Sequence, residues 1–149
     1  MKIGVVSDTH GYVPNSLHEV LAGVDRIVHA VDVGSYAVVV ELQLIAPMTG
    51  VLGNNDFDRY GGILSPRLSF EAEGVSFLVA HRQRDTGWPS SDADIVICGH
   101  THMRSLVERD GRYLLNPGST TYPRGGLEPS VCIVEVSDGQ ILGFDFREL

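Results

Sequence analysis

Short apolar runs alternate with amphipathic segments through the first third of the chain. The apolar runs predict β-strands, because each is too short for a helix and is bounded by polar residues or glycine; they cover residues 2–7, 25–30 and 48–52. The amphipathic segments between them predict helices over residues 14–22 and 35–46, with Ser35 as the N-cap of the second helix. This β-α-β-α-β order predicts parallel strands joined by right-handed crossovers.

The second half of the chain has a different pattern, in which pairs of strands flank glycine-containing dipeptides. Such dipeptides predict tight hairpin turns, and they occur at residues 73–74, 110–111 and 138–139. The flanking strands are predicted over residues 67–72, 75–80, 106–109, 113–115, 131–136 and 140–146. In the last strand, Leu142, Phe144 and Phe146 occupy alternate positions and are predicted to face the core. Parallel units followed by hairpins predict two packed β-sheets with helices outside.

Composition and charge place the chain among ordinary globular proteins. Its 149 residues suffice for one domain with a sizeable core, and 43% of them are hydrophobic and 20% charged. The formal net charge is -8 and the eleven basic residues are scattered, so extended nucleic-acid binding is not expected. No apolar run approaches the roughly 20 residues of a membrane span, so no membrane association is expected.

Two features favour a cytoplasmic protein. The chain runs from Met1 and Lys2 directly into the first strand, which leaves no room for a signal peptide. The two cysteines, Cys98 and Cys132, lie far apart within apolar strands, and this setting favours buried free thiols over a disulfide or metal ligands.

Candidate metal ligands follow the apolar strands at several places. Asp8 and His10 come after the first strand, and a similar pair, at positions 100 and 102, comes after a later one. On an extended segment, residues i and i+2 point to the same side, so each pair is predicted to converge on one site. Further polar residues that follow strands are Asp32, Asn54 and His81. Carboxylate, amide and imidazole groups at strand ends are what a two-metal hydrolytic site requires.

Taken singly, these residues also fit ordinary structural roles. Asp8 and His10 are compatible with an Asx turn, and Asp32 is compatible with a cap of the following helix. Asn54 alone is typical of a turn, and His81 alone is typical of a histidine bonded within the core. The later His-x-His pair is more specific, because two neutral imidazoles after a buried strand suit a divalent cation.

Together the motifs resemble the calcineurin-like metallophosphoesterase superfamily. In order along the chain they are Asp8-Thr9-His10, His29-Ala30-Val31-Asp32, Gly53-Asn54-Asn55-Asp56, His81 and Gly99-His100-Thr101-His102. The segment Asn116-Pro117-Gly118-Ser119 and the lack of a cap insertion are similar to the compact branch of small phosphodiesterases, which also contains the retromer subunit Vps29. The resemblance implies a single α/β domain over residues 1–149, a four-layered α/β/β/α sandwich of two mixed β-sheets flanked by helices.

The resemblance also implies a dinuclear metal centre, with the turn at residues 116–119 beside it. The implied ligands of one metal are Asp8, His10 and His102. The implied ligands of the other metal are Asn54, His81 and His100, and the residue that would bridge both is Asp32. Two divalent cations are expected, manganese foremost, with iron, zinc, cobalt and nickel also compatible. The expected reaction is direct attack of a metal-bound hydroxide on phosphorus.

Three positions depart from the family pattern. Val31 stands where a glycine usually precedes the bridging aspartate. Asn55 stands where many members carry a histidine able to protonate the leaving oxygen, and Gln83 replaces the second histidine of a His-Gly-His segment. Because an amide cannot act as a general acid, good leaving groups such as activated aryl diesters should react far better than alkyl phosphates.

Weaker assignments concern residues near the predicted ligands. Asn54 and Arg82 are assigned to substrate binding, while Arg82 is also compatible with a solvated loop. Asn55, Asp56 and His29 are assigned supporting roles in catalysis. Asp56 is equally compatible with buttressing a turn, and His29 with simply ending the second strand.

A metal-dependent phosphoesterase, and more specifically a phosphodiesterase acting on a small phosphoester, is the leading hypothesis. The alternative is a Vps29-like protein-binding scaffold with weak or no catalysis, since the same fold serves binding in that relative. All seven predicted ligand positions hold competent side chains, which favours the enzyme. A third hypothesis, a metal-site protein of slight activity, rests on Asn55. The sequence predicts neither the natural substrate nor the oligomeric state.

Overall fold

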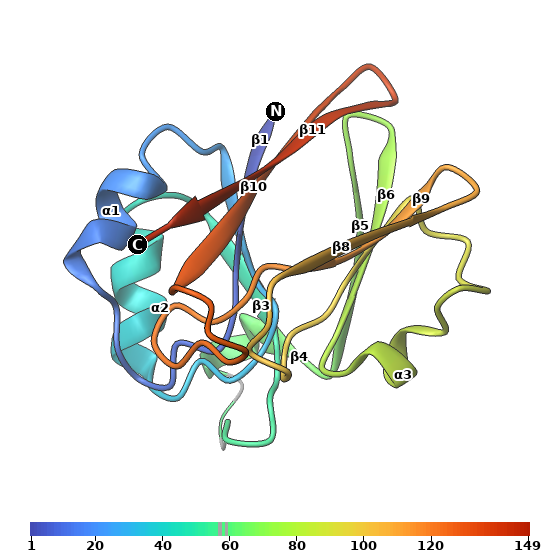
Figure 1. The fold of residues 1–149 in the computed structure, drawn as a ribbon. Coiled ribbons are helices and arrows are strands. Elements are labelled where there is room, and N and C mark those ends of the chain that lie inside the picture. The colour runs from blue at the N-terminus through green and yellow to red at the C-terminus, as the bar shows by residue number, and fades with distance from the viewer. Residues whose placement is uncertain (57, 59) are drawn as a thin grey trace.

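Two mixed β-sheets lie face to face in the computed structural model of the chain, which describes residues 1–56, 58 and 60–149 (Figure 1). The six-stranded sheet has the order β11 (Gln140–Glu148), β10 (Ser130–Ser137), β1 (Lys2–Val6), β2 (Arg26–His29), β3 (Met48–Val51) and β4 (Leu64–Ser65). The five-stranded sheet has the order β5 (Arg67–Ala72), β6 (Val75–Ala80), β7 (Ile95–Ile97), β9 (Arg112–Asn116) and β8 (Ser105–Arg109). Neighbouring strands from β1 to β4 are parallel, as are β6, β7 and β9, whereas the remaining pairs are antiparallel. Both sheets are therefore mixed, which confirms the predicted fold class.

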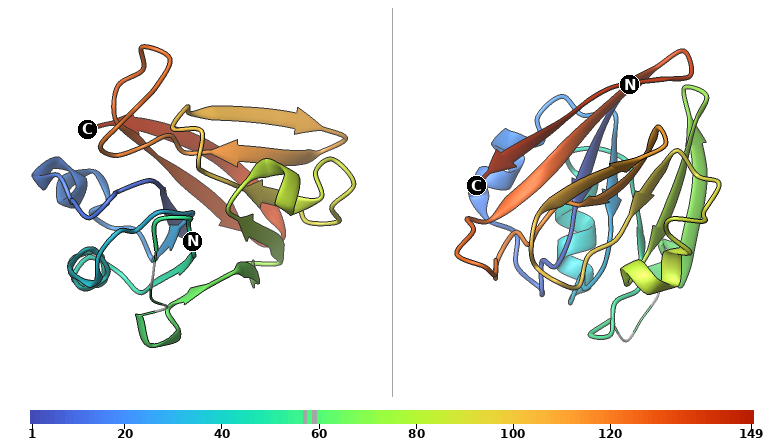
Figure 2. Two further views of the ribbon diagram at one scale, coloured as in Figure 1. Left: turned by 90° about the horizontal axis from the view of Figure 1, so that it is seen from below. Right: turned by 45° about the vertical axis from the view of Figure 1, so that its right-hand side comes forward.

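Helices flank the two sheets on their outer sides. The helices α1 (Asn15–Val20) and α2 (Tyr36–Gln43) lie beside the six-stranded sheet, and α3 (Gln83–Thr86) lies beside β6 and β7 on the opposite side (Figure 2). The two predicted helices are confirmed, and both are shorter than predicted at each end. The fourth layer is thin, because α3 has only four residues and the chain after it covers part of the sheet with Trp88 and Ala93.

Two apolar clusters hold these layers together. The cluster between the sheets contains Phe77, Val79 and Ile97 from one sheet and Val5 and Val28 from the other, all of them buried. A second cluster joins α1 and α2 to the six-stranded sheet, and its large buried members include Leu17, Leu21, Ile27 and Leu42. Burial of this apolar surface is the main favourable term in folding, and it fixes the relative position of the strand ends.

The three predicted hairpin turns are confirmed by strand pairing and by backbone geometry. β5 pairs with β6, β8 with β9 and β10 with β11, and each pair flanks one of the predicted dipeptides. Glu73, Asp110 and Asp138 have φ values of 51°, 53° and 50°, and each is followed by a glycine whose φ is 75° or more. Positive φ at both central residues defines the turn that matches the twist of paired strands.

The prediction for Leu142 is wrong. A register shift between Glu135 and Val136 pairs them with Gly143 and Ile141, so that Leu142 is an extra residue in β11. Its side chain is 56% exposed, while Ile141 packs against the core in its place. Such a bulge changes which face a residue occupies, and simple alternation along the sequence does not reveal it. The short strand β4 and the turn of 3-10 helix before it, η1 (Tyr60–Gly62), were not predicted either.

Both cysteines are buried free thiols, as predicted. Among the described residues, no helix combines the length and the apolar character needed to cross a membrane.

Candidate metal centre

The predicted ligands lie where the carboxyl ends of parallel strands from both sheets meet. Asp8, Asp32 and Asn54 follow β1, β2 and β3 of one sheet, and His81 and His100 follow β6 and β7 of the other. The backbone N–H of His100 donates a hydrogen bond to Asp8 Oδ2 at 3.2 Å, which joins the two sheets at this point. The structure thereby brings together residues that are far apart in the sequence.

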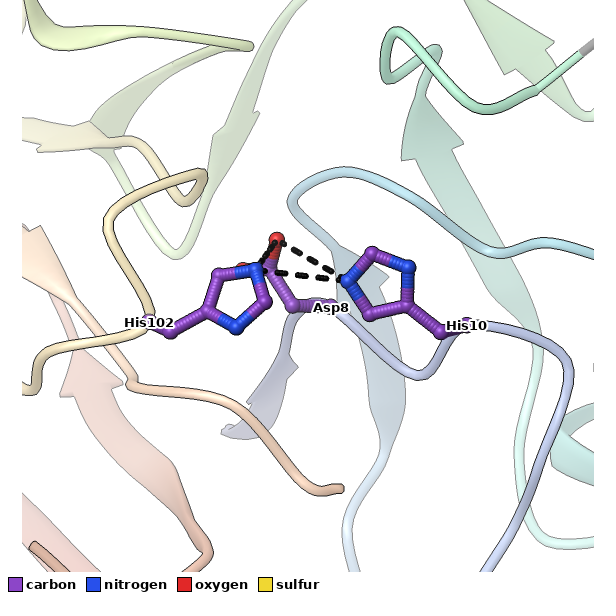
Figure 3. Close-up of side chains that lie close together, drawn as sticks. All are labelled: Asp8, His10 and His102. Carbon is purple, nitrogen blue, oxygen red and sulfur yellow. Dashed lines mark hydrogen bonds and ion pairs between the residues drawn. The ribbon is translucent and has the colours of Figure 1, made fainter. Parts of the chain in front are cut away.

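One cluster contains Asp8, His10 and His102 (Figure 3). His102 Nε2 lies 3.2 Å from Asp8 Oδ1 and 3.3 Å from His10 Nε2, and His10 Nε2 lies 4.0 Å from the same carboxylate oxygen. One oxygen and two nitrogens therefore face a common point. Carboxylate and imidazole are ligands that first-row divalent metals accept, so this cluster could hold such an ion.

The two carboxylate oxygens of Asp8 differ in their hydrogen bonding. Oδ2 accepts hydrogen bonds from the hydroxyl of Ser7 and from the N–H of His100. Oδ1 is buried, and among the described residues it has no hydrogen-bond partner. Burial raises the pKa of Asp8, because desolvation disfavours the charged carboxylate. A cation at Oδ1 would offset that cost, so the residues present fit a metal ion.

The hydrogen bonding of His102 prepares it for the same role. Its Nδ1 lies 2.7 Å from the backbone carbonyl of Tyr122. A carbonyl oxygen can only accept, so Nδ1 carries the proton and the neutral ring has a lone pair on Nε2. That lone pair points toward Asp8 and His10. Metal-binding histidines are commonly fixed in this way, with the second ring nitrogen donating to a carbonyl.

A second cluster contains Asp32, His81 and His100. His81 Nε2 and His100 Nδ1 are 3.0 Å apart, and Asp32 Oδ1 accepts a hydrogen bond from the N–H of Asn55 at 3.0 Å. The pKa of His100 is lowered by burial and by the neighbouring His81 and Arg82. The neutral imidazole, which is the form that binds metals, is therefore favoured. Both clusters thus present imidazole nitrogens beside a carboxylate.

The backbone at the ligands is not extended, and this corrects the argument by which the D-x-H and H-x-H pairs were predicted to converge. Five of the seven predicted ligands have positive φ, with values from 48° to 70°: Asp8, His10, Asp32, His100 and His102. Left-handed backbone costs non-glycine residues roughly 1–2 kcal/mol each. Such strain tends to gather at functional sites. The ligands therefore converge through strained turns at the strand ends.

The loop after β3 positions the second cluster. Asp56 accepts hydrogen bonds from the N–H groups of Gly53, Val33 and Gly34, at 2.8, 3.2 and 2.7 Å. Its carboxylate therefore holds this loop against the loop that follows β2. This agrees with one of the two alternatives for Asp56, that it buttresses a turn. Asn54 and Asn55 are exposed in the same loop, and Asn54 is the one predicted ligand that is not a member of either cluster.

His29 supports the site through Thr9. Its Nε2 lies 2.9 Å from Thr9 Oγ1, and that hydroxyl donates to the carbonyl of Val33 at 2.9 Å. Since the hydroxyl has one hydrogen, His29 Nε2 is the donor to Thr9. This chain of hydrogen bonds joins the end of β2 to the loop that carries Asp32. Of the two alternatives for His29, a role in supporting the site is therefore favoured over a residue that only ends the strand.

The burial of His29 leads to a prediction about stability and pH. Complete burial is the main cause that lowers its pKa to about 4, from 6.5 in an unfolded chain. Between these values the unfolded state takes up a proton that the folded state does not, so stability falls as the pH drops from about 6.5 to about 4. The expected slope from this group is about 1.4 kcal/mol per pH unit. His29→Gln keeps a donor for Thr9 and should show a flatter dependence in urea unfolding of chelator-treated protein; parallel curves would contradict the assignment.

Val31 is compatible with the site because a glycine lies opposite it. The side chain of Val31 is fully buried, and its Cγ2 would lie 2.6 Å from a Cβ placed on Gly99. A Cβ there would also meet Ser7 Oγ and Asp8 Oδ2. The absence of a side chain at Gly99 therefore provides the space that Val31 fills.

Further residues support the site, and of these Ser7, Thr121 and Tyr122 were not singled out from the sequence. The hydroxyls of Ser119 and Thr121 both donate to the backbone carbonyl of Asp8, at 2.9 and 3.0 Å, so the turn at residues 116–119 does lie beside the cluster. Ser7, Thr9 and Tyr122 contact ligands or their loops as described above. Ser7 and Thr9 could have been predicted to contact the site, because they are adjacent to Asp8 in the sequence. No local sequence pattern predicts the contacts of Thr121 and Tyr122.

Known proteins resemble this chain in sequence and in fold. Residues 1–139 match the family described as "Calcineurin-like phosphoesterase superfamily domain". A protein of Methanothermobacter thermautotrophicus, named as a probable metallophosphoesterase, is 36% identical over 95% of this chain and 89% of its own length. The solved structure of an archaeal phosphodiesterase is 28% identical and superposes with a TM-score of 0.84 over 100% of both chains.

A more distant structure has the same fold. A single mutant of Vps29 from Entamoeba histolytica superposes with a TM-score of 0.79 at 20% identity, over 100% of this chain and 99% of its own. That likeness extends to the fold alone, whereas the family match covers most of the sequence and includes the clustered ligands. The chain therefore belongs to the calcineurin-like phosphoesterase superfamily.

Proposed function

We propose that this chain is a metal-dependent phosphodiesterase that holds two divalent cations, with manganese as the first candidate. The observation that carries the proposal is the Asp8 cluster. There a buried carboxylate oxygen, without a hydrogen-bond partner among the described residues, lies 3.2 Å from Nε2 of His102, whose Nδ1 donates to the carbonyl of Tyr122. With the ring neutral, these two acceptors repel each other, and a cation between them removes the repulsion. The family of the chain then favours hydrolysis of a phosphoester as the use of that cation.

The proposed ligands of the first cation are Asp8, His10 and His102. Those of the second are His81, His100 and Asn54, with Asp32 shared between the two. When bound, the cations would supply Lewis acidity and make a water molecule nucleophilic near neutral pH. The chain itself does the positioning: Tyr122 fixes the tautomer of His102, and the N–H of Asn55 holds one oxygen of Asp32.

Asn54 and Arg82 are the proposed contacts to the substrate. Asn54 is exposed in the loop after β3, and Arg82 directly follows His81. An arginine at this position would add positive charge beside the second cluster and favour an anionic group of the substrate there. His29 and Asp56 act as positioning residues in this proposal, because their contacts are with Thr9 and with backbone N–H groups.

The side chain at position 55 leads to a prediction about leaving groups. Asn55 is exposed at the site, and its amide cannot protonate a departing alkoxide. We expect 4-nitrophenyl phosphodiesters to be hydrolysed well and dialkyl phosphodiesters very slowly. Asn55→His should raise the rate on the dialkyl substrate about tenfold and change the aryl rate little, since only the alkoxide needs a proton. Steady-state kinetics on both substrates test this, and comparable wild-type rates would argue against it.

The activity itself is tested by metal replacement. Chelator-treated protein, refilled in turn with Mn²⁺, Ni²⁺, Zn²⁺, Co²⁺ or Fe²⁺, is assayed on an aryl phosphodiester beside the Asp32→Ala variant. Metal-dependent turnover that Asp32→Ala removes supports the proposal. Equal and negligible activity with every metal, in protein that remains folded, would instead favour a Vps29-like scaffold.

The proposal also includes a single catalytic domain over residues 1–149, a small phosphoester as substrate and a cytoplasmic location. Supporting the first, the core between the sheets contains side chains from near both ends of the chain, among them Ile3 and Phe146. Supporting the last, Cys98 and Cys132 are free thiols, which is the state expected in a reducing compartment.

A further inference from the structure

A cavity of about 560 Å³ adjoins the second ligand cluster. His100 lines it at one side, and its other lining includes three arginines, which are Arg82, Arg84 and Arg104. Among the described residues that line the cavity, none is acidic. This concentration of positive charge is notable in a chain whose net charge is -8. The cavity is therefore a local exception to a surface that would repel anions.

The three arginines differ in whether a group of the protein already pairs with them. Arg104 pairs with Glu148 at 2.8 Å, and Arg84 lies 3.8 Å from Asp85 in an exposed pair that contributes little. Arg82 differs from both, because its Nε is buried and has no acceptor among the described residues. A buried N–H without a partner is costly, and the planar guanidinium fork fits a carboxylate or phosphate. The geometry around Arg82 thus favours an anionic ligand.

Apolar side chains also line the cavity, beside uncharged polar ones such as Gln83 and Ser105. Cys98 and Leu114 are buried beneath the cavity, and Met103 is 47% exposed. These apolar side chains would contact the body of an organic anion bound in the cavity.

We propose that this cavity is a subsite for a second anionic group, so that the preferred substrate is a phosphodiester with a carboxylate or phosphate on an apolar arm. The inference rests on the proposed function, because the scissile phosphate must lie at the metal clusters for its arm to reach Arg82. The second anion would accept from the guanidinium of Arg82, and the arm would lie against Leu114 and Met103.

The test uses inert phosphonates, which cannot be hydrolysed. Their arms contain three to five methylene groups and end in a carboxylate, in a second phosphonate, or in a neutral carboxamide of the same shape as the carboxylate. Calorimetric titration of zinc-loaded protein should show the anionic forms binding at least about tenfold more tightly than the carboxamide. A gain for only one anion supports the proposal and identifies that anion as the second group.

Two variants assign the effect to the cavity. Arg82→Gln should reduce the advantage of the charged arm to less than about twofold, since it removes the unpaired guanidinium. Arg109→Gln is the matched control, because Arg109 is 63% exposed at the far hairpin and should leave the advantage unchanged. The comparison of ligands in the wild-type protein needs no variant, so a folding defect in Arg82→Gln would not obscure the result.

The same preparations are assayed on an aryl phosphodiester to separate the two proposals. Equal affinity for the charged and carboxamide arms, with hydrolysis intact, would overturn the subsite alone. An Arg82-dependent gain without any hydrolysis would support the subsite and overturn the proposed activity. Absence of binding by every phosphonate would overturn the subsite, and the hydrolysis assay would still report on the activity.

Discussion

Asp8→Asn is expected to remove metal-dependent phosphodiesterase activity while leaving the chelator-treated protein at least as stable as the wild type. The amide is isosteric with the carboxylate, and its oxygen can still accept from Ser7 and from the N–H of His100. Its NH₂ group would take the place of Oδ1 and donate to His102 Nε2, which lies 3.2 Å away. The variant thus satisfies a buried position that the wild-type side chain leaves without a partner.

The loss of activity follows from the charge that the same change removes. Without the carboxylate, a divalent cation faces two neutral imidazoles, and an NH₂ group points at it. The cation's contribution to the transition state is several kcal/mol, so kcat/KM should fall by roughly 10³-fold or more.

Thermal unfolding with and without metal distinguishes this explanation from simple damage. Wild-type protein should gain stability when Mn²⁺ or Zn²⁺ is added, and Asp8→Asn should gain clearly less, because only the second cluster keeps its ligands. Asp110→Asn is the matched control, because Asp110 is 88% exposed in a hairpin turn that asparagine also favours. A metal-induced stabilisation of normal size in Asp8→Asn would show that this carboxylate is not a ligand.

Features of the fold that depend on local chemistry were predictable from the sequence. The Glu73-Gly74 turn needs positive φ at two neighbouring residues, and a glycine at the second position is the sequence pattern that such a turn favours. Leu142 shows where such reasoning fails, because the bulge that exposes it depends on how two strands pair. The four-residue helix α3 and the two-residue strand β4 are too short to leave a periodic pattern.

For the candidate metal site, the residue types were predictable from the sequence, whereas the geometry was not. The order of aspartates and histidines after the strands indicated which residues could bind metal, and the structure brings six of them into two clusters. The left-handed backbone of Asp8 and His10 was not predictable, because the energy that holds it comes from packing and hydrogen bonds elsewhere. Thr121 and Tyr122 contact residues that are 113 and 20 positions away in the sequence. Only the tertiary structure supplies such contacts.

Gly53→Ala is expected to disable the site through a steric conflict with Asp32. The backbone of Gly53 is not left-handed, so alanine brings no strain of its own. A Cβ at this position, however, would overlap the carboxylate and the backbone nitrogen of Asp32, and backbone atoms cannot turn aside as a flexible side chain can. Overpacking of this kind typically costs about 1–3 kcal/mol of stability.

The effect on activity should exceed the effect on stability, because the displaced group is the proposed shared ligand. Moving Asp32, or the loop that Asp56 clamps beside it, by about 1 Å is expected to lower kcat roughly 10²-fold. Gly143→Ala is the matched control, since nothing lies within 4 Å of a Cβ there. Urea unfolding, the metal content of refilled protein and aryl phosphodiester kinetics together measure the outcome. If Gly53→Ala retains two metals and wild-type kcat, then Asp32 does not occupy the position that the proposed mechanism requires.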